Sequence, residues 1–209
     1  KEINATIGIA LEEDGSPLCL PSLSDSIKLP KSNAFTYAPS PGRPDLRKLW
    51  KEMMVRKSPG LQGKTFSQPV VCSALTHGLS MAAYLFCDAG DKVLLPDLYW
   101  ENYDLIFNLA YGAELETFPT FNAAGGFNVE GLRAKLNQGA RGKKIVCLNF
   151  PNNPSGYTPT IEEAQAIVSV LKQAAEAGDK VVALLDDAYF GLVFEKGVYE
   201  ESIFAPLCD

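Results

Sequence analysis

The chain has 209 residues, of which 46% are hydrophobic, and its formal net charge is -6 at neutral pH. This size and composition are those of a globular protein with one large domain or slightly more, closed around a sizeable core. The basic run 141–144 is too short to hold a phosphate backbone, so nucleic acid is excluded as an expected partner.

Runs of apolar and β-branched residues predict the strands of this chain. These runs are Val70–Ser73, Lys92–Pro96, Glu114–Pro119, Lys144–Phe150 and Val181–Asp186. Most of them are separated by segments with helical periodicity. This alternation predicts an α/β fold with a mainly parallel sheet.

Three predicted helices matter for the site. The first, Pro44–Met54, has a proline in its first turn, where a missing amide donor does no harm. Leu79–Phe86 is apolar almost all round, so we expect other elements to cover it on both sides. The clearest helix begins at Thr160, whose hydroxyl caps it while Glu163 reaches back, and it ends at Gly178. We expect this helix to join two parallel strands.

Ligands of open parallel sheets bind beyond the carboxyl ends of the strands, so the residues that follow each run are the first candidates. Ser73–Gly78 opens a helix, and its free amides with the Thr76 hydroxyl would form an anion cup. The pattern alone favours a plain helix cap. Tyr99 follows the next strand and either stacks on a flat ligand or, more commonly for an aromatic residue, fills the core.

Polar residues also lie beyond or at the ends of the last two runs. Asn153 precedes a proline, and this pattern fits a turn as well as a ligand contact. Asp186 ends an uninterrupted apolar run, where a carboxylate is costly to bury without a cationic partner, and this favours a functional role. Asp187 should face the opposite side of the strand, whereas Tyr189 can return to the side of Asp186.

Several other kinds of site find no support in the sequence. His77 is the only histidine and has no cluster of metal ligands around it, which argues against a zinc site and a Ser-His-Asp triad. Neither a G-x-G-x-x-G nor a G-x-x-x-x-G-K-[ST] pattern is present, which lowers the case for nicotinamide or P-loop nucleotide binding.

Two motifs in this order, Asn-Pro-Ser-Gly at 153–156 and Asp-x-Ala-Tyr at 186–189, resemble those of the class I/II aminotransferases, which are fold-type I pyridoxal-phosphate enzymes. The opening segment, with Asn4–Gly8 followed by Glu13, Asp14, Gly15 and Pro17, is similar to the start of the aspartate/aromatic branch. The likeness runs from about Asn4 to Phe194. It implies the three-layer large domain of these enzymes over 41–209, and an N-terminal segment 1–40 that belongs to a smaller domain and the dimer interface.

The resemblance also implies where the cofactor, pyridoxal 5'-phosphate, is held. The backbone of Ala74 and Leu75 and the hydroxyl of Thr76 would bind its phosphate. Tyr99 would stack on the pyridine ring, although its aromatic neighbour leaves the choice of stacking ring open. Tyr37 falls on the loop tyrosine that reaches the phosphate of the neighbouring subunit, and this implies a homodimer.

The remaining implied contacts concern the ring and the substrate. Asn153 and Tyr189 would donate hydrogen bonds to the phenolic oxygen of the ring, and Asp186 would pair with the protonated ring nitrogen. In that position Asp186 makes the ring an electron sink when the substrate loses its Cα proton. Asp186 and Tyr189 are therefore the implied catalytic residues. Gly8 and Asn153 would lie near the substrate.

One departure from the family pattern is large. The Schiff-base lysine of the family follows the Asp-x-Ala-Tyr motif by a few tens of residues, and in this chain the only lysine after Asp186 is Lys196, in a predicted turn. We therefore expect these residues to be the N-terminal and central part of a longer protein. Ala74 also stands where glycine or serine is common in the family.

The expected function is transamination, in which an amino group moves between an amino acid and a 2-oxo acid. The alternatives are another pyridoxal-phosphate reaction on the same fold, such as a C–S lyase or decarboxylase, or an aminotransferase-like sensor module without catalysis. No apolar stretch is long enough for a bilayer and no signal peptide is evident, so no membrane partner is expected. The five cysteines are scattered, which predicts buried thiols in the cytoplasm.

Overall fold

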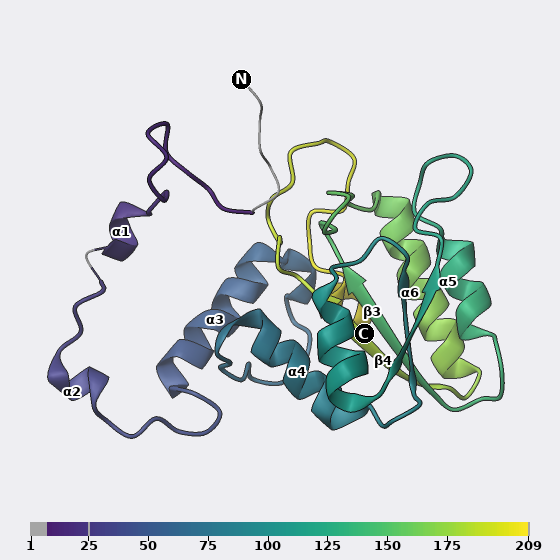
Figure 1. Cartoon of the computed structure of the whole chain (residues 1–209), viewed down its shortest axis with the longest axis horizontal. Coiled ribbons are helices and arrows are strands. Elements are labelled where there is room, and N and C mark those ends of the chain that lie inside the picture. The colour runs from purple at the N-terminus through teal and green to yellow at the C-terminus, as the bar shows by residue number, and fades with distance from the viewer. Residues whose placement is uncertain (1–7, 25, 209) are drawn as a thin grey trace. The chain divides into compact units, whose positions relative to one another are not determined.

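The computed structural model describes residues 8–24 and 26–208. The chain forms two compact units, Lys1–Ser40 and Pro41–Asp209 (Figure 1). The roles predicted for them, a part of a small domain with a dimer interface and a large cofactor domain, stay predictions.

The first unit contains two short helices, α1 (Pro21–Ser24) and α2 (Lys31–Ala34), and an isolated bridge between Leu11 and Pro17. Every described residue of this unit is exposed. Four of the residues that carry the resemblance at the start of the chain, 4–7, lie outside the described residues.

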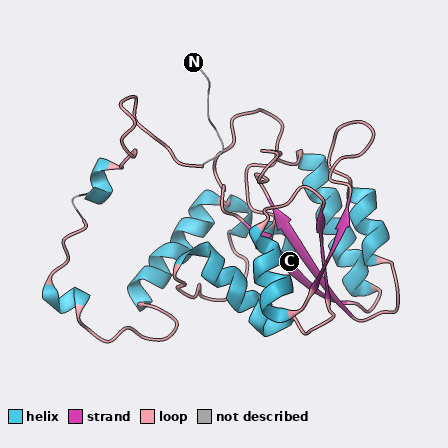
Figure 2. Ribbon diagram, viewed as in Figure 1, coloured by secondary structure: helices cyan, strands magenta, loops and turns pink. Residues whose placement is uncertain are grey.

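The second unit is built on a sheet of four parallel strands in the order β2-β1-β3-β4 (Figure 2). The strands are β1 (Lys92–Pro96), β2 (Glu114–Phe118), β3 (Lys143–Asn149) and β4 (Lys180–Asp186). They confirm four of the five predicted strands and the parallel α/β fold. In the register of β3 and β4, Asn149 lies opposite Asp186, so both strands end at the same level.

Helices cover the two faces of this sheet (Figure 1). One face packs against α4 (Ala74–Phe86) and a π-helical segment (Asp104–Leu109), through Val93, Leu95, Ile145 and Cys147. The other face packs against α5 (Val129–Leu136) and α6 (Ile161–Glu176), through Leu94, Val146 and Leu148. Because successive strand residues point to opposite faces, the apolar runs serve two cores, and the three-layer arrangement is confirmed.

Local capping explains where the clearest predicted helix, α6, begins. At α6 the Thr160 side chain accepts a hydrogen bond from the Glu163 amide, while the Glu163 carboxylate accepts one from the Thr160 amide. This capping box satisfies two amides that lack partners within the helix. The helix α3 (Pro44–Lys57) begins with its proline, as predicted, and is followed by short helices η1 (Pro59–Leu61) and, near the end of the chain, α7 (Phe204–Leu207).

Two predictions about local structure are wrong. Val70–Ser73 is not a strand: it is irregular, and its Val71 amide donates to the Pro41 carbonyl rather than to a neighbouring strand. β-branched residues favour extended backbone, but a strand needs a partner. The helix α4 is not covered on both sides either, because only Leu79 and Ala83 are buried in it.

The cysteines are only partly as predicted. Cys87 and Cys147 are buried, whereas Cys19 is exposed and the other two are intermediate. All five are free thiols. Thiol burial therefore follows from packing in the sheet core and not from a feature common to all five.

No helix in the described part of the chain combines the length and the apolar character needed to cross a membrane.

Candidate functional site

The carboxyl ends of β3 and β4 bring three buried polar side chains together, and we name Tyr103, Asn149 and Asp186 the strand-end cluster. Asn149 is 5% exposed and donates from Nδ2 to the Asp186 carbonyl oxygen at 2.8 Å. Its Oδ1 accepts a hydrogen bond from the Asn153 amide at 2.7 Å. One side chain thus ties the end of β4 to the turn that follows β3.

The Asp186 carboxylate is 4% exposed and has a donor on each oxygen. Oδ2 accepts a hydrogen bond from the Tyr103 hydroxyl at 2.6 Å, and Oδ1 accepts one from the Ala188 amide at 3.1 Å. Within residues 8–24 and 26–208, no cation forms an ion pair with this carboxylate. A buried negative charge that has only neutral donors is suited to a cationic ligand.

An open cavity of about 580 Å³ lies beside Asp186. Its volume falls within the range of small-molecule sites. The lining includes Ala74 and Leu75 from α4 and Asp186 from β4, and is otherwise mostly apolar, with Arg47 of α3 as the basic residue. The structure therefore brings two of the residues predicted to hold a phosphate and the residue predicted to hold a ring nitrogen to the same cavity.

The first turn of α4, which we define as Ala74, Leu75 and Thr76, is exposed. Ala74 has a φ of 65°, a left-handed conformation that is costly for a residue with a Cβ atom. Its amide donates to the Cys72 carbonyl at 3.1 Å. The amides of Leu75 and Thr76 belong to a first helical turn, where no intrahelical acceptor is within reach, so they are available to an anion. Thr76 lies on this turn but not in the cavity lining.

The other predicted ring contacts lie near one another. Asn153 Nδ2 donates to the Tyr189 hydroxyl at 3.3 Å, so the turn after β3 and the turn after β4 meet through these two side chains. The Tyr99 ring is stacked on Tyr103 with 6.4 Å between centroids and 13° between planes, and its hydroxyl donates to Asp104 at 3.0 Å. Tyr99 thus contacts Tyr103, and Tyr103 in turn is hydrogen-bonded to Asp186.

Two predicted residues belong to the first unit. Gly8 is exposed, and the Tyr37 side chain is 88% exposed. Their predicted contacts, with the substrate and with the phosphate of a neighbouring subunit, stay predictions.

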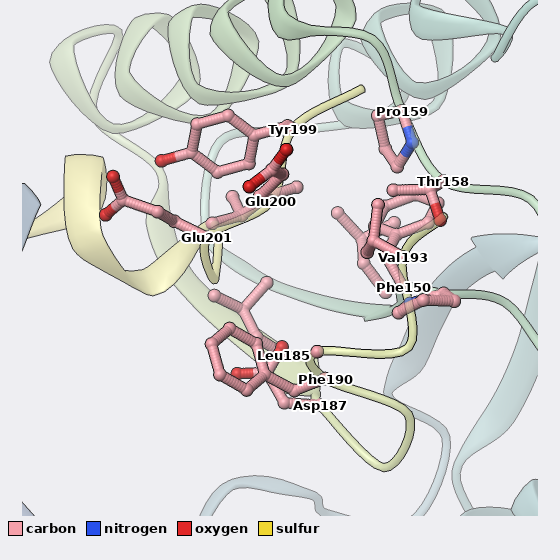
Figure 3. Close-up of a pocket in the computed structure, with 14 residues that line it drawn as sticks. Phe150, Thr158, Pro159, Leu185, Asp187, Phe190, Val193, Tyr199, Glu200 and Glu201 are labelled. Carbon is pink, nitrogen blue, oxygen red and sulfur yellow. The ribbon is translucent and has the colours of Figure 1, made fainter. Parts of the chain in front are cut away.

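Asp187 is absent from the lining of this cavity, as strand alternation predicts. It lines a second open cavity of about 670 Å³, whose lining shares Trp50, Leu75, Ala183 and Leu185 with the first. It also lines a hollow of about 20 Å³, with Leu185 and Phe190 beside it and Tyr199 and Pro159 on the opposite side (Figure 3). A space of this size holds about one water molecule and no larger ligand. Asp187 accepts a hydrogen bond from the Ser202 hydroxyl at 2.6 Å, and burial raises the pKa of its carboxyl to about 6.

Two members of the strand-end cluster, Tyr103 and Asn149, were not predicted. Asn149 carried a usable signal, because it is the polar residue that ends an apolar run and its strand lies next to that of Asp186. Tyr103 carried none, because its bond to Asp186 joins residues 83 positions apart. Tyrosine in a helix beside a sheet is most often a core residue.

Comparisons with known proteins agree on one family. A family model described as aminotransferase class I and II matches residues 3–205. An aspartate aminotransferase of Geobacillus stearothermophilus is 30% identical over 159 residues, which cover 71% of this chain and 36% of that protein. A probable N-acetyl-LL-diaminopimelate aminotransferase of Bacillus subtilis is 27% identical over 169 residues, which cover 80% of this chain and 40% of that protein.

Solved structures support the same fold. The crystal structure of an aminotransferase from Anaerococcus prevotii matches with a TM-score of 0.77 and 26% identity, covering 88% of this chain and 45% of that one. This chain therefore spans less than half the length of each of these three proteins.

Proposed function

We propose, from the premise that this chain belongs to the class I and II aminotransferase family, that it forms the cofactor-binding part of an aminotransferase. The family uses pyridoxal 5'-phosphate. The proposed reaction moves an amino group between an amino acid and a 2-oxo acid.

The observation that carries the proposal is the Asp186 carboxylate, which is buried and lines a cavity large enough for the cofactor. Its oxygens have neutral donors, so the charge on it is left for a ligand to balance. A protonated pyridine nitrogen supplies such a charge, and the residues present fit the cofactor in this respect. When bound, the protonated ring withdraws electrons from the substrate Cα as its proton leaves.

The remaining ring contacts follow from the turns after β3 and β4. Asn153 and Tyr189 already contact each other through a hydrogen bond, and both are partly accessible. We assign them to the phenolic oxygen of the ring, where two donors stabilise negative charge. Tyr99, held parallel to Tyr103, is assigned to the face of the ring.

The phosphate is assigned to the first turn of α4. The amides of Leu75 and Thr76 and the Thr76 hydroxyl can donate to an anion, and the positive end of the helix dipole lies there. The Ala74 amide, now bonded to Cys72, can join them only if that bond opens. Tyr37 is assigned to the phosphate of a neighbouring subunit in a homodimer, and Gly8 to the region of the substrate.

The lysine that carries the cofactor in this family is proposed to lie outside these 209 residues. The three relatives described above are more than twice as long as the part that this chain matches. The acceptor for the substrate proton is proposed to be that lysine and not a residue of the strand-end cluster.

Pyridoxamine 5'-phosphate tests the cofactor site, because its amine cannot condense with surface lysines. We expect the chain to bind it, and Asp186→Ala to weaken binding by about tenfold or more, since one partner of a buried charge pair is lost. The matched control is Asp187→Asn, a neighbouring carboxyl that faces the other side of the strand, and its affinity should stay within about twofold of wild type. Equal affinities of wild type and Asp186→Ala would overturn the assignment.

The reaction is tested on the full gene product with a 15N-labelled amino acid and a 2-oxo acid. Transamination predicts that the label appears in the new amino acid, and that Asp186→Ala loses most of this transfer. Release of a thiol or of carbon dioxide in place of label transfer would identify a lyase or a decarboxylase on the same site.

A further inference from the structure

The hydrogen bond between Tyr103 and Asp186 is buried at both ends and lies at the centre of the proposed site. The Tyr103 hydroxyl is 2.6 Å from Asp186 Oδ2, and the two residues are 2% and 4% exposed. They come from different layers, since Tyr103 lies on the helical side of one face of the sheet and Asp186 ends β4. The bond therefore joins the helix layer to the strand that carries the predicted ring contact.

The Tyr103 ring has little freedom to move. Trp100 contacts it edge to face, with 5.7 Å between centroids, and Phe107 lies at 5.9 Å. Tyr99 is stacked on the Tyr103 ring with 6.4 Å between centroids. With the ring confined in this way, the position of the hydroxyl is set by packing, before any ligand arrives.

The direction of the hydrogen bond follows from the state of the phenol. Burial, above all, and the neighbouring Cys147 and Asp186 raise the pKa of Tyr103 well above its usual range. The phenol therefore stays protonated, and its hydroxyl donates the hydrogen bond to Oδ2. Hydrogen bonds from a neutral donor to a carboxylate are short and stronger than those between neutral groups.

The Asp186 carboxylate thus accepts a hydrogen bond at each of its two oxygens. Tyr103 holds Oδ2 and the Ala188 amide holds Oδ1, while each oxygen keeps a lone pair for a ligand. Because Ala188 lies only two residues after Asp186 in the same turn, its amide alone leaves the plane of the carboxylate free to turn. The hydroxyl of Tyr103, fixed by a different layer, removes that freedom.

We propose that Tyr103 is a positioning residue that orients the Asp186 carboxylate toward the ring nitrogen of the cofactor, an inference that rests on the proposed function. Its contribution is to the recognition of the nitrogen and not to the affinity for the ring or the phosphate. The loss of the hydroxyl should therefore reduce the preference for a ring that contains nitrogen.

Two probes separate this role from a structural one: pyridoxamine 5'-phosphate and its analogue with carbon in place of the ring nitrogen. Wild type should bind the nitrogen compound about tenfold or more tightly than the analogue. Tyr103→Phe should reduce this ratio about fivefold, while its affinity for the analogue stays within about twofold of wild type. A structural defect would weaken the binding of both probes by the same factor.

The control is Tyr111→Phe, which removes a phenol hydroxyl that lies 3.4 Å from Ser80 and outside the cluster. Its ratio should equal that of wild type. In an Asp186→Asn background, Tyr103→Phe should leave the ratio unchanged, because no carboxylate remains to be oriented.

The outcomes distinguish the two hypotheses. If wild type discriminates between the probes and Tyr103→Phe retains the full ratio, the inference is wrong and the proposed function stands. If wild type binds both probes equally, the pairing of Asp186 with the nitrogen is wrong, and both fall.

A measurement on wild type covers the case in which Tyr103→Phe does not fold. In protein labelled with 13C at the tyrosine Cζ atom, the Tyr103 signal should shift more with the nitrogen compound than with the analogue. Equal shifts would overturn the inference.

Discussion

Tyr103, Asn149 and Asp186 are between 2% and 5% exposed, whereas Ala74, Leu75 and Thr76 in the first turn of α4 are all exposed. Both groups belong to the proposed site, but they differ in what holds them. Each side chain of the strand-end cluster has a hydrogen-bond partner within the protein. In the first turn of α4, the amides of Leu75 and Thr76 have no acceptor in the helix. The ring end of the site is thus formed by the fold itself, and the phosphate end needs its ligand.

This difference predicts that substitutions at the ring end cost stability even without cofactor, while those at the phosphate end cost only binding. The strand-end cluster is polar and buried, so the loss of one member leaves others unpaired. An exposed turn has water as an alternative partner.

The largest expected effect is that of Asn149→Ala. It leaves the buried Asp186 carbonyl and the partly buried Asn153 amide without their side-chain partner, and a buried group left unpaired costs about 1 to 3 kcal/mol. We expect the free energy of unfolding to fall by about 3 to 5 kcal/mol, measured by urea denaturation of the protein without cofactor.

Asn137→Ala is the matched control, because Asn137 is an exposed asparagine after α5. It should change the free energy of unfolding by less than about 0.5 kcal/mol. A similarly small change in Asn149→Ala would show that the strand-end cluster does not stabilise the fold, and the comparison would fail.

A second prediction concerns the other face of the same strand end. Burial raises the pKa of Asp187 to about 6, above its ordinary value of 3.8, so the folded protein favours the protonated form. The stability that Asp187 contributes is therefore fully present below pH 3.8 and is lost as the pH rises through about 6. Between these limits the loss amounts to up to about 3 kcal/mol.

Asp187→Asn should remove this loss, which is measured as the difference between variant and wild type in unfolding free energy across the range. Comparison with the variant is needed because other carboxyls act in the opposite direction. The pKa of Asp179, for example, is lowered by hydrogen bonds from Gly142 and Arg141. A difference that does not grow with pH would contradict the prediction.

The smallest effect on stability is expected for Thr76→Ala. Because Thr76 is exposed, the free energy of unfolding should change by less than about 0.5 kcal/mol. The affinity for pyridoxamine 5'-phosphate should nevertheless fall about fivefold, since a hydroxyl donor to the phosphate is lost. If stability fell strongly and affinity did not, the first turn of α4 would be structural, contrary to its assignment.

The sequence predicted most of the second unit because its signals are local. Apolar runs bounded by turns mark β1 to β4, and Thr160 with Glu163 marks the start of α6 within four residues. The prediction of a strand at Val70–Ser73 was wrong for a physical reason. Strand propensity describes a single residue, whereas a strand requires a neighbouring strand with free hydrogen-bonding groups.

The residues of the site could likewise be predicted only where a local pattern marks them. Asp186, Asn153 and Tyr189 follow apolar runs, and a polar residue at a strand end is visible in the sequence. Tyr103 was not visible, because its role arises from a contact between two layers that no local pattern encodes. The exposure of α4 was not visible either, because the surroundings of an apolar helix depend on how the rest of the chain packs.

The proposed function and the role of Tyr103 both depend on the Asp186 carboxylate meeting the proton on the ring nitrogen. The direct test is a crystal structure with pyridoxamine 5'-phosphate at saturating concentration. We predict that an Asp186 carboxylate oxygen lies about 3 Å from the ring nitrogen, within hydrogen-bonding distance. A ring bound with its nitrogen away from Asp186, or a cavity that stays empty, would contradict the account.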